Sequence, residues 1–272
     1  MTDHALSRLF DTPMHNDLIV IKAGTGVLTK SLDGTLDHAA MVHLAVAIAG
    51  LIDAGHRCLL VSSGAVGSGV SAFQLDQYPS DTVTRQACAA VGQARLMQAY
   101  GGLFSNFGIT VAQVLLTATD LATPERARCV SDTLARLLST PRILPVINEN
   151  DSVAVEELRF GDNDMLSVRV AVLVSARRMI LLTSADGLID SETNTVIAEV
   201  TDIGAVSRHV RATKGRFALG GMASKLHAIR VAVEAGIEAH ICNGRHPQRM
   251  AAILAGNGFS TRFLPTRGEA RP

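Results

Sequence analysis

Short apolar runs recur along this chain, and a segment long enough for a helix separates most of them. Strands that are apolar on both sides must be covered on both faces, which is typical of a mainly parallel sheet with helices on either side. The predicted strands are residues 18–21, 57–61, 109–115, 143–147, 179–183 and 237–242, with 259–264 as an edge strand. The pattern therefore predicts one α/β sandwich.

Segments with helical periodicity fill the intervals, and a glycine follows several of them. The predicted helices are residues 37–54, 84–107, 119–138, 164–175, 220–235 and 246–255. The polar stretch between Asp186 and Val200 is predicted to form a hairpin. With no internal repeat or low-complexity linker, residues 17–272 are predicted to form a single domain, preceded by a flexible arm at residues 1–16.

The charge balance and the cysteines limit the possible functions. Lys+Arg and Asp+Glu are both 25, and the resulting net charge of zero argues against a nucleic-acid or membrane-surface role. The 4 cysteines are far apart in the sequence, which predicts reduced thiols and a cytoplasmic protein. The 9 histidines show no metal-ligand spacing, and no apolar run is long enough to span a bilayer. We therefore expect a soluble protein with no protein-bound metal.

Two glycine-rich loops follow predicted strands at the sheet edge where ligands bind in such folds, and a third opens a predicted helix. The loops are Lys22-Ala23-Gly24-Thr25-Gly26, Ser63-Gly64-Ala65-Val66-Gly67 and Gly220-Gly221-Met222-Ala223-Ser224-Lys225. Glycines let backbone N–H groups approach a phosphate, and the two lysines add positive charge. Each loop alone also fits an ordinary turn, and none has the Walker or dinucleotide-binding spacing. Together they suit a polyphosphate whose charge must be neutralised during transfer.

Residues 146–164, VINENDSVAVEELRFGDND, are dense in carboxylates and amides. They follow a predicted buried strand, and unpaired carboxylates are costly in a protein core. They suit a small polar ligand, because carboxylates bind an ammonium group and amides bind either charge. A solvated acidic loop with turn-forming Asn and Asp is the alternative. The lysine-bearing glycine loops favour a site for a second substrate.

The chain resembles the glutamate 5-kinases of the amino-acid kinase family from about residue 18 to residue 264. The resemblance rests on the motifs IVIKAGTGVLT, VSSGAVGSG, QACAAVGQARLM, QVLLTATD, PVINENDSVAVEELRFGDNDMLS, LLTSADGLID and GGMASKLHA, in this order. It implies an open three-layer αβα sandwich. It also implies transfer of the γ-phosphoryl group of ATP to the side-chain carboxylate of L-glutamate, which gives glutamyl 5-phosphate in the first step of proline biosynthesis.

The same resemblance assigns roles to residues. Lys22 and Lys225 would flank the transferring phosphoryl group, and Asp164 would hold both lysines. The implied glutamate-binding residues are Ser63, Asn148, Glu149, Asn150, Asp151, Asp162 and Asn163. The implied nucleotide-binding residues are Lys22, Gly24, Thr183, Ser184, Leu219, Gly220, Gly221, Met222, Ala223, Ser224 and Lys225. Mg²⁺ would bridge ATP oxygens with few protein ligands or none.

Several departures from the family pattern have consequences. Gly26 stands where many relatives have Ser or Thr, and Ala218-Leu219 replaces a Gly-Thr pair, so both changes bear on ATP affinity. Ile189 replaces an aromatic residue, which we interpret as a packing change. A short form without the C-terminal PUA-type domain of many bacterial members is expected. Feedback inhibition by proline is expected to survive, and a homo-oligomer and transfer of product to glutamyl phosphate reductase are further expectations.

Two other functions remain compatible with the sequence. The nearer is a sister kinase of the same fold that acts on another carboxylate, carbamate or a nucleoside monophosphate. The acid-rich stretch argues against it, because free glutamate carries an ammonium group that such a pocket can pair. The farther is a non-catalytic sensor, which the presence of Lys22, Asp164 and Lys225 together disfavours.

Overall fold

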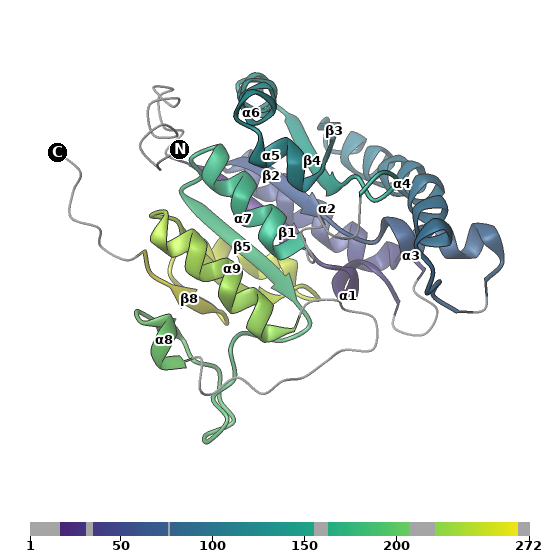
Figure 1. Cartoon of the computed structure of the whole chain (residues 1–272). Coiled ribbons are helices and arrows are strands. Elements are labelled where there is room, and N and C mark those ends of the chain that lie inside the picture. The colour runs from purple at the N-terminus through teal and green to yellow at the C-terminus, as the bar shows by residue number, and fades with distance from the viewer. Residues whose placement is uncertain (1–16, 31–34, 76, 155–162, 207–220, 266–272) are drawn as a thin grey trace.

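The computed structural model describes residues 17–30, 35–75, 77–154, 163–206 and 221–265 (Figure 1). The predicted arm at residues 1–16 and the predicted site residues Asp162, Leu219 and Gly220 lie outside the described residues. The same holds for the Ala218-Leu219 departure.

The described strands form one 8-stranded sheet in the order β3-β4-β2-β1-β5-β7-β8-β6. Every neighbouring pair is parallel except β7 and β8, which are antiparallel. The strands are β1 (Leu18–Ala23), β2 (Arg57–Ser62), β3 (Thr110–Leu116), β4 (Ile143–Glu149), β5 (Arg178–Thr183), β6 (Glu199–Val200), β7 (Glu238–Asn243) and β8 (Thr261–Phe263). The mainly parallel sheet that the apolar runs predict is therefore confirmed.

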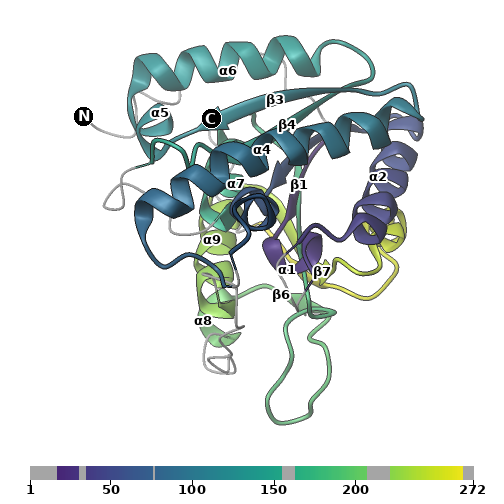
Figure 2. The ribbon, with the colours of Figure 1, turned by 90° about the vertical axis from the view of Figure 1, so that its right-hand side faces the viewer.

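Helices cover both faces of the sheet, so the chain forms three layers (Figures 1 and 2). Leu18 and Val20 of β1 belong to a core cluster that includes α6, α7 and α9. Ile19 and Ile21 belong to a second cluster on the other face, with α2, α4 and α10. The described helices are α1 (Thr25–Leu28), α2 (His38–Asp53), α3 (Ala65–Val70), α4 (Thr82–Ser105), α5 (Ala118–Ala122), α6 (Pro124–Leu138), α7 (Asn163–Leu173), α8 (Ile203–Val206), α9 (Met222–Glu234) and α10 (Met250–Leu254), with the 3-10 turns η3 (Ser71–Phe73) and η6 (Pro247–Arg249).

The predicted helix at residues 119–138 is wrong in one respect, because it is two helices, α5 and α6. Thr123 between them is extended, with φ −91° and ψ 118°. The next residue is Pro124, and the proline ring disfavours helical geometry in the residue before it. Thr117 and Asp120 form a capping box that starts α5 independently.

The predicted edge strand at residues 259–264 is also misplaced, because β8 lies inside the sheet. It pairs with β7 on one side and with β6 on the other. The predicted hairpin after Asp186 is present only as one antiparallel bridge between Ile189 and Val196. After that bridge the chain turns to join β8 in parallel as β6.

Two glycines bring α3 and α4 into close contact. A Cβ atom on Gly69 would lie 1.9 Å from the carbonyl oxygen of Cys88, and one on Gly92 would lie 1.8 Å from that of Ala65. Any side chain at either position would therefore force the two helices apart. The contact fixes two elements beside predicted site residues, because α3 begins two residues after Ser63, and Gln93 of α4 accepts a hydrogen bond from Asn148 of β4.

All the cysteines are free, as predicted. Cys58, Cys88 and Cys242 are buried, and burial raises the pKa of Cys58 and Cys242 to about 12, so these thiols are protonated. Within the described ranges, no helix combines the length and the apolar character needed to cross a membrane.

Candidate active site

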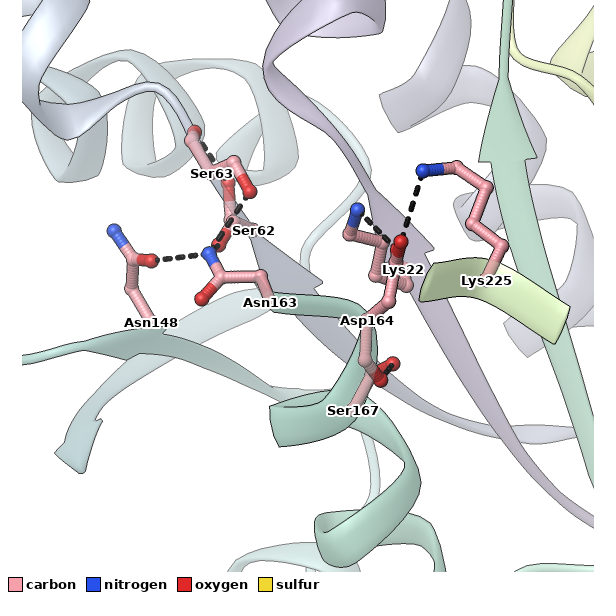
Figure 3. A network of polar contacts seen from close by, with 8 residues as sticks. All are labelled: Lys22, Ser62, Ser63, Asn148, Asn163, Asp164, Ser167 and Lys225. Carbon is pink, nitrogen blue, oxygen red and sulfur yellow. Dashed lines mark hydrogen bonds and ion pairs between the residues drawn. The ribbon is translucent and has the colours of Figure 1, made fainter. Parts of the chain in front are cut away.

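One buried carboxylate pairs with two lysines that are far apart in the sequence (Figure 3). Nζ of Lys22 lies 2.5 Å from Oδ1 of Asp164, and Nζ of Lys225 lies 2.8 Å from Oδ2. The exposed fractions of these side chains are 4% for Lys22, 0% for Asp164 and 14% for Lys225. Among the described residues, two ammonium groups therefore share one carboxylate.

The fold places these three groups at the carboxyl edge of the sheet. Lys22 is near the end of β1, where it pairs in register with Val61 of β2 and Leu181 of β5. Asp164 is in the first turn of α7, where the helix dipole favours a carboxylate. The hydroxyl of Ser167 donates to the backbone oxygen of Asp164 over 2.6 Å and fixes this turn.

Gly24 keeps space open beside the ammonium group of Lys22. A Cβ atom at Gly24 would lie 3.1 Å from Nζ of Lys22. The backbone of Gly24 is extended, with φ −79° and ψ 165°, and its oxygen accepts from the N–H groups of Val27 and Leu28. A side chain at this position would therefore compete with the lysine, or with its ligand, for the same space.

Asn163 joins the loop after β2 to the end of β4. Its Nδ2 lies within hydrogen-bond distance of three acceptors, the backbone oxygen of Ser62 (2.7 Å), Oγ of Ser63 (2.8 Å) and Oδ1 of Asn148 (2.9 Å). Because one NH₂ group has two protons, it shares them among these acceptors. Asn163 is thus in direct contact with two other predicted substrate-binding residues, Ser63 and Asn148.

The sequence did not reveal the groups that support this cluster from α4. Nδ2 of Asn148 donates to Oε1 of Gln93 over 2.9 Å, and Oγ of Ser62 lies 2.9 Å from the hydroxyl of Tyr100. Gln93 is only 8% exposed, and burial raises the pKa of Tyr100 so that its hydroxyl stays protonated. The sequence signal for this support was a glutamine within an apolar stretch of a predicted helix, because a buried amide requires hydrogen-bond partners.

The remaining predicted residues that the structure describes occupy the same edge of the sheet. Glu149 ends β4, and Asn150 and Asp151 follow it. Thr183 ends β5, and its hydroxyl is bonded within the turn to Ala185. Ser184 is exposed, and Gly221, Met222, Ala223 and Ser224 form the start of α9 ahead of Lys225.

The described residues include no group of three or more His, Cys, Asp or Glu side chains that could hold a metal ion. Asp164, the buried carboxylate nearest the lysines, is occupied by two ammonium groups.

Comparisons with known proteins agree with this geometry. Residues 17–243 match the model of the amino acid kinase family. The chain is 42% identical to a glutamate 5-kinase of Gloeobacter violaceus over 260 residues, covering 93% of this chain and 70% of the relative. It is 39% identical to a glutamate 5-kinase of Clostridium acetobutylicum, covering 91% of this chain and 94% of the relative.

Solved structures of more distant proteins share the fold. Carbamate kinase from Giardia lamblia bound to AMP-PNP superimposes with a TM-score of 0.64 at 14% identity, covering 91% of this chain and 98% of that one. UMP kinase from Bacillus anthracis superimposes with a TM-score of 0.63 at 17% identity, covering 92% and 96%. At such identities the likeness extends to the three-layer architecture and not to the substrate.

Proposed function

Because the chain belongs to the glutamate 5-kinases of the amino acid kinase family, we propose that it transfers the γ-phosphoryl group of ATP to the side-chain carboxylate of L-glutamate. The products are L-glutamyl 5-phosphate and ADP, and the reaction is the first step of proline biosynthesis. The observation that carries the proposal is the pairing of Lys22 and Lys225 with the single carboxylate of Asp164.

Lys22 and Lys225 act by neutralising charge on the transferring group. A glutamate carboxylate is ionised at neutral pH, so its oxygen attacks the γ-phosphorus without a general base. As that bond forms, the bond from the γ-phosphorus to the bridging oxygen breaks, and ADP leaves with the electron pair. The two ammonium groups stabilise the negative charge that develops on the phosphoryl and bridging oxygens.

Asp164 is a positioning residue in this mechanism. Its two oxygens hold one ammonium group each, from β1 and from α9. Long lysine side chains lose conformational entropy when they are fixed, and the ion pairs with the buried carboxylate offset that loss before substrate binds. The lysines are therefore already placed when the nucleotide arrives.

We assign the acceptor to the polar cluster around Asn163. Ser63, Asn148 and Asn163 offer amide and hydroxyl groups to the carboxylates of glutamate, and Glu149, Asn150 and Asp151 lie at the same edge. The acidic side chains there suit the glutamate ammonium group. Asp162 belongs to the same proposed set.

We assign the nucleotide to the opposite side of Lys22. Gly24, Thr183 and Ser184 end β1 and β5, and the start of α9 contributes Gly221, Met222, Ala223, Ser224 and Lys225, with Leu219 and Gly220 before it. Mg²⁺ bound to ATP oxygens would add positive charge at the phosphates, which fits a site whose described carboxylate is already paired.

The hydroxylamine trap for acyl phosphate, with L-glutamate and MgATP, tests the proposal. We expect trapped product with the native chain and a kcat at least about a hundredfold lower in Lys225→Met, with a smaller effect on glutamate binding. Arg128→Met, an exposed cation on α6, serves as the control and should keep native activity. Activity on another acid and none on glutamate, or an unchanged kcat in Lys225→Met, would overturn the assignment.

We infer that proline inhibits the enzyme at the acceptor cluster, that the enzyme is a cytoplasmic homo-oligomer, and that it passes its labile product to glutamyl phosphate reductase. A steady-state assay in which millimolar proline has no effect would rule out the first inference. Analytical ultracentrifugation that finds only a monomer would rule out the homo-oligomer.

A further inference from the structure

A recess lies beside α3 and α4, two helices whose positions Figure 1 shows. Its volume is about 430 Å³, which is within the range of small-molecule sites. Its walls come from the segment after α1 (Lys30 and Leu36), from the α3–η3 region (Ser68 and Ser71) and from α4 (Arg95 and Ala99). It shares no lining residue with the proposed glutamate or nucleotide sites.

The described lining of this recess carries positive charge and no carboxylate. Lys30 and Arg95 are both exposed to it, and the remaining lining side chains bear hydroxyl, amide, imidazole or aliphatic groups. Two cations that face the same recess repel each other, and a bound anion removes that repulsion. The recess is therefore electrostatically suited to an anionic ligand.

Arg95 is oriented by its neighbours before any ligand binds. Its Nη1 donates to the backbone oxygen of Ser68 over 3.3 Å and to Oγ of Ser71 over 3.1 Å. These bonds use a single nitrogen of the guanidinium group, so Nη2 and Nε can donate to a ligand. On the other wall, the N–H of Lys30 donates to the oxygen of Thr35 over 2.8 Å, which fixes the backbone that carries the lysine.

We propose that this recess binds a small phosphate-bearing metabolite at a site separate from the reaction centre. A guanidinium fork, an ammonium point charge and nearby hydroxyls together match the several oxygens of a phosphate group. Leu36 and Ala99 supply an apolar wall for the organic part of such a ligand. The proposal does not depend on the chemistry at Asp164.

The ligand would contact the helices that shape the proposed acceptor cluster. Arg95 lies on α4, two residues after Gln93, which bonds to Asn148. The N–H of Ser68 on α3 donates to the oxygen of Gly64, the residue after Ser63. A bound phosphate is therefore positioned to act on glutamate affinity through α3 and α4.

NMR titration of the full chain with inorganic pyrophosphate tests the site. We expect saturable shifts of the Thr35, Ser71 and Gln98 amides, and at least tenfold weaker binding at this site in Lys30→Gln/Arg95→Gln. Arg128→Gln, which removes an exposed cation from α6, is the control and should bind as the native chain does. Arg95→Lys keeps the charge but loses the fork, so its affinity should be intermediate, and it tests the site if the double variant does not fold.

Three results would overturn the proposal. They are no saturable shift at these amides up to about 10 mM pyrophosphate, native affinity in the folded double variant, and succinate binding at the same amides as tightly as pyrophosphate. Shifts around Lys225 report separately on the reaction centre, so failure of either assignment is distinguishable from failure of the other.

Discussion

Asp164→Asn is the most direct perturbation of the paired lysines. The amide has nearly the shape of the carboxylate but no charge, so Lys22, with a side chain only 4% exposed, loses its buried counter-ion. Breaking a buried pair by removing one partner costs about 3–5 kcal/mol, because the other charge remains desolvated. Lys225 is more exposed, at 14%, and can move toward water, so we expect the lower end, about 3 kcal/mol.

Urea and thermal unfolding in the absence of nucleotide measure this effect. A loss of about 3 kcal/mol corresponds to a fall in Tm of about 6–12 °C for a domain of this size. In the trap assay, kcat should fall at least about a hundredfold because the ammonium groups lose their orientation. MgATP should raise the Tm of the variant by more than it raises that of the native chain, because its phosphates supply the missing negative charge.

The matched control is Asp132→Asn, which removes an exposed carboxylate from α6. We expect its free energy of unfolding to stay within about 0.5 kcal/mol of the native value. If Asp164→Asn is destabilised by less than about 1 kcal/mol and retains native kcat, the lysines do not depend on this carboxylate. The mechanism built on their pairing would then be wrong.

Three further outcomes are expected. Gly92→Ala should lower the free energy of unfolding by about 3 kcal/mol or more, because its Cβ would meet a backbone oxygen at 1.8 Å. Gly102→Ala is the control in the same helix, where an added Cβ would have nothing within 4 Å, and it should stabilise the protein by about 0.5–1 kcal/mol. Equal effects of the two substitutions in urea unfolding would refute the packing argument. Gln93→Leu should raise the KM for glutamate more than it lowers kcat, since it leaves Asn148 without its acceptor, and a native KM would show that Gln93 plays no positioning role. Burial lowers the pKa of His240 below its ordinary 6.5. Burial opposes ionisation of Glu238, but hydrogen bonds from Arg262 and His240 lower the pKa of that carboxyl below 4.5. Both groups therefore bind fewer protons in the folded chain, so the free energy of unfolding should be highest above pH 6.5 and fall as the pH drops, with a weaker dependence just below pH 6.5 in His240→Gln.

The parallel sheet and the meeting of the two lysines could be predicted from the sequence. Apolar runs identify strands locally, and the carboxyl ends of parallel strands must share one edge, so Lys22 was expected near the groups that follow the other strands. The break at Thr123 was also readable, since Pro124 disfavours helix in the residue before it, but helical periodicity on either side masked that signal.

The bond between Gln93 and Asn148 could not be predicted in the same way. These residues are 55 positions apart, and periodicity shows which face of a helix is buried without showing which polar group it meets. The recess at Arg95 was missed for a related reason, since tertiary packing brings the segment after α1 together with α3 and α4 to form it. Partners chosen by tertiary packing leave little trace in local sequence.

The order of the strands restricts how this protein can open to exchange its substrates. β1 is hydrogen-bonded to β2 on the side of the proposed acceptor site and to β5 on the side of the proposed nucleotide site, with Ile19 to Ala23 in continuous register along both neighbours. Separating the two sides at β1 would break that ladder of hydrogen bonds, so relative movement that keeps the ladder must come from twisting of the sheet or from segments beyond the strand ends. Two spin labels placed across β1 and β5 should therefore report the same separation with and without substrates.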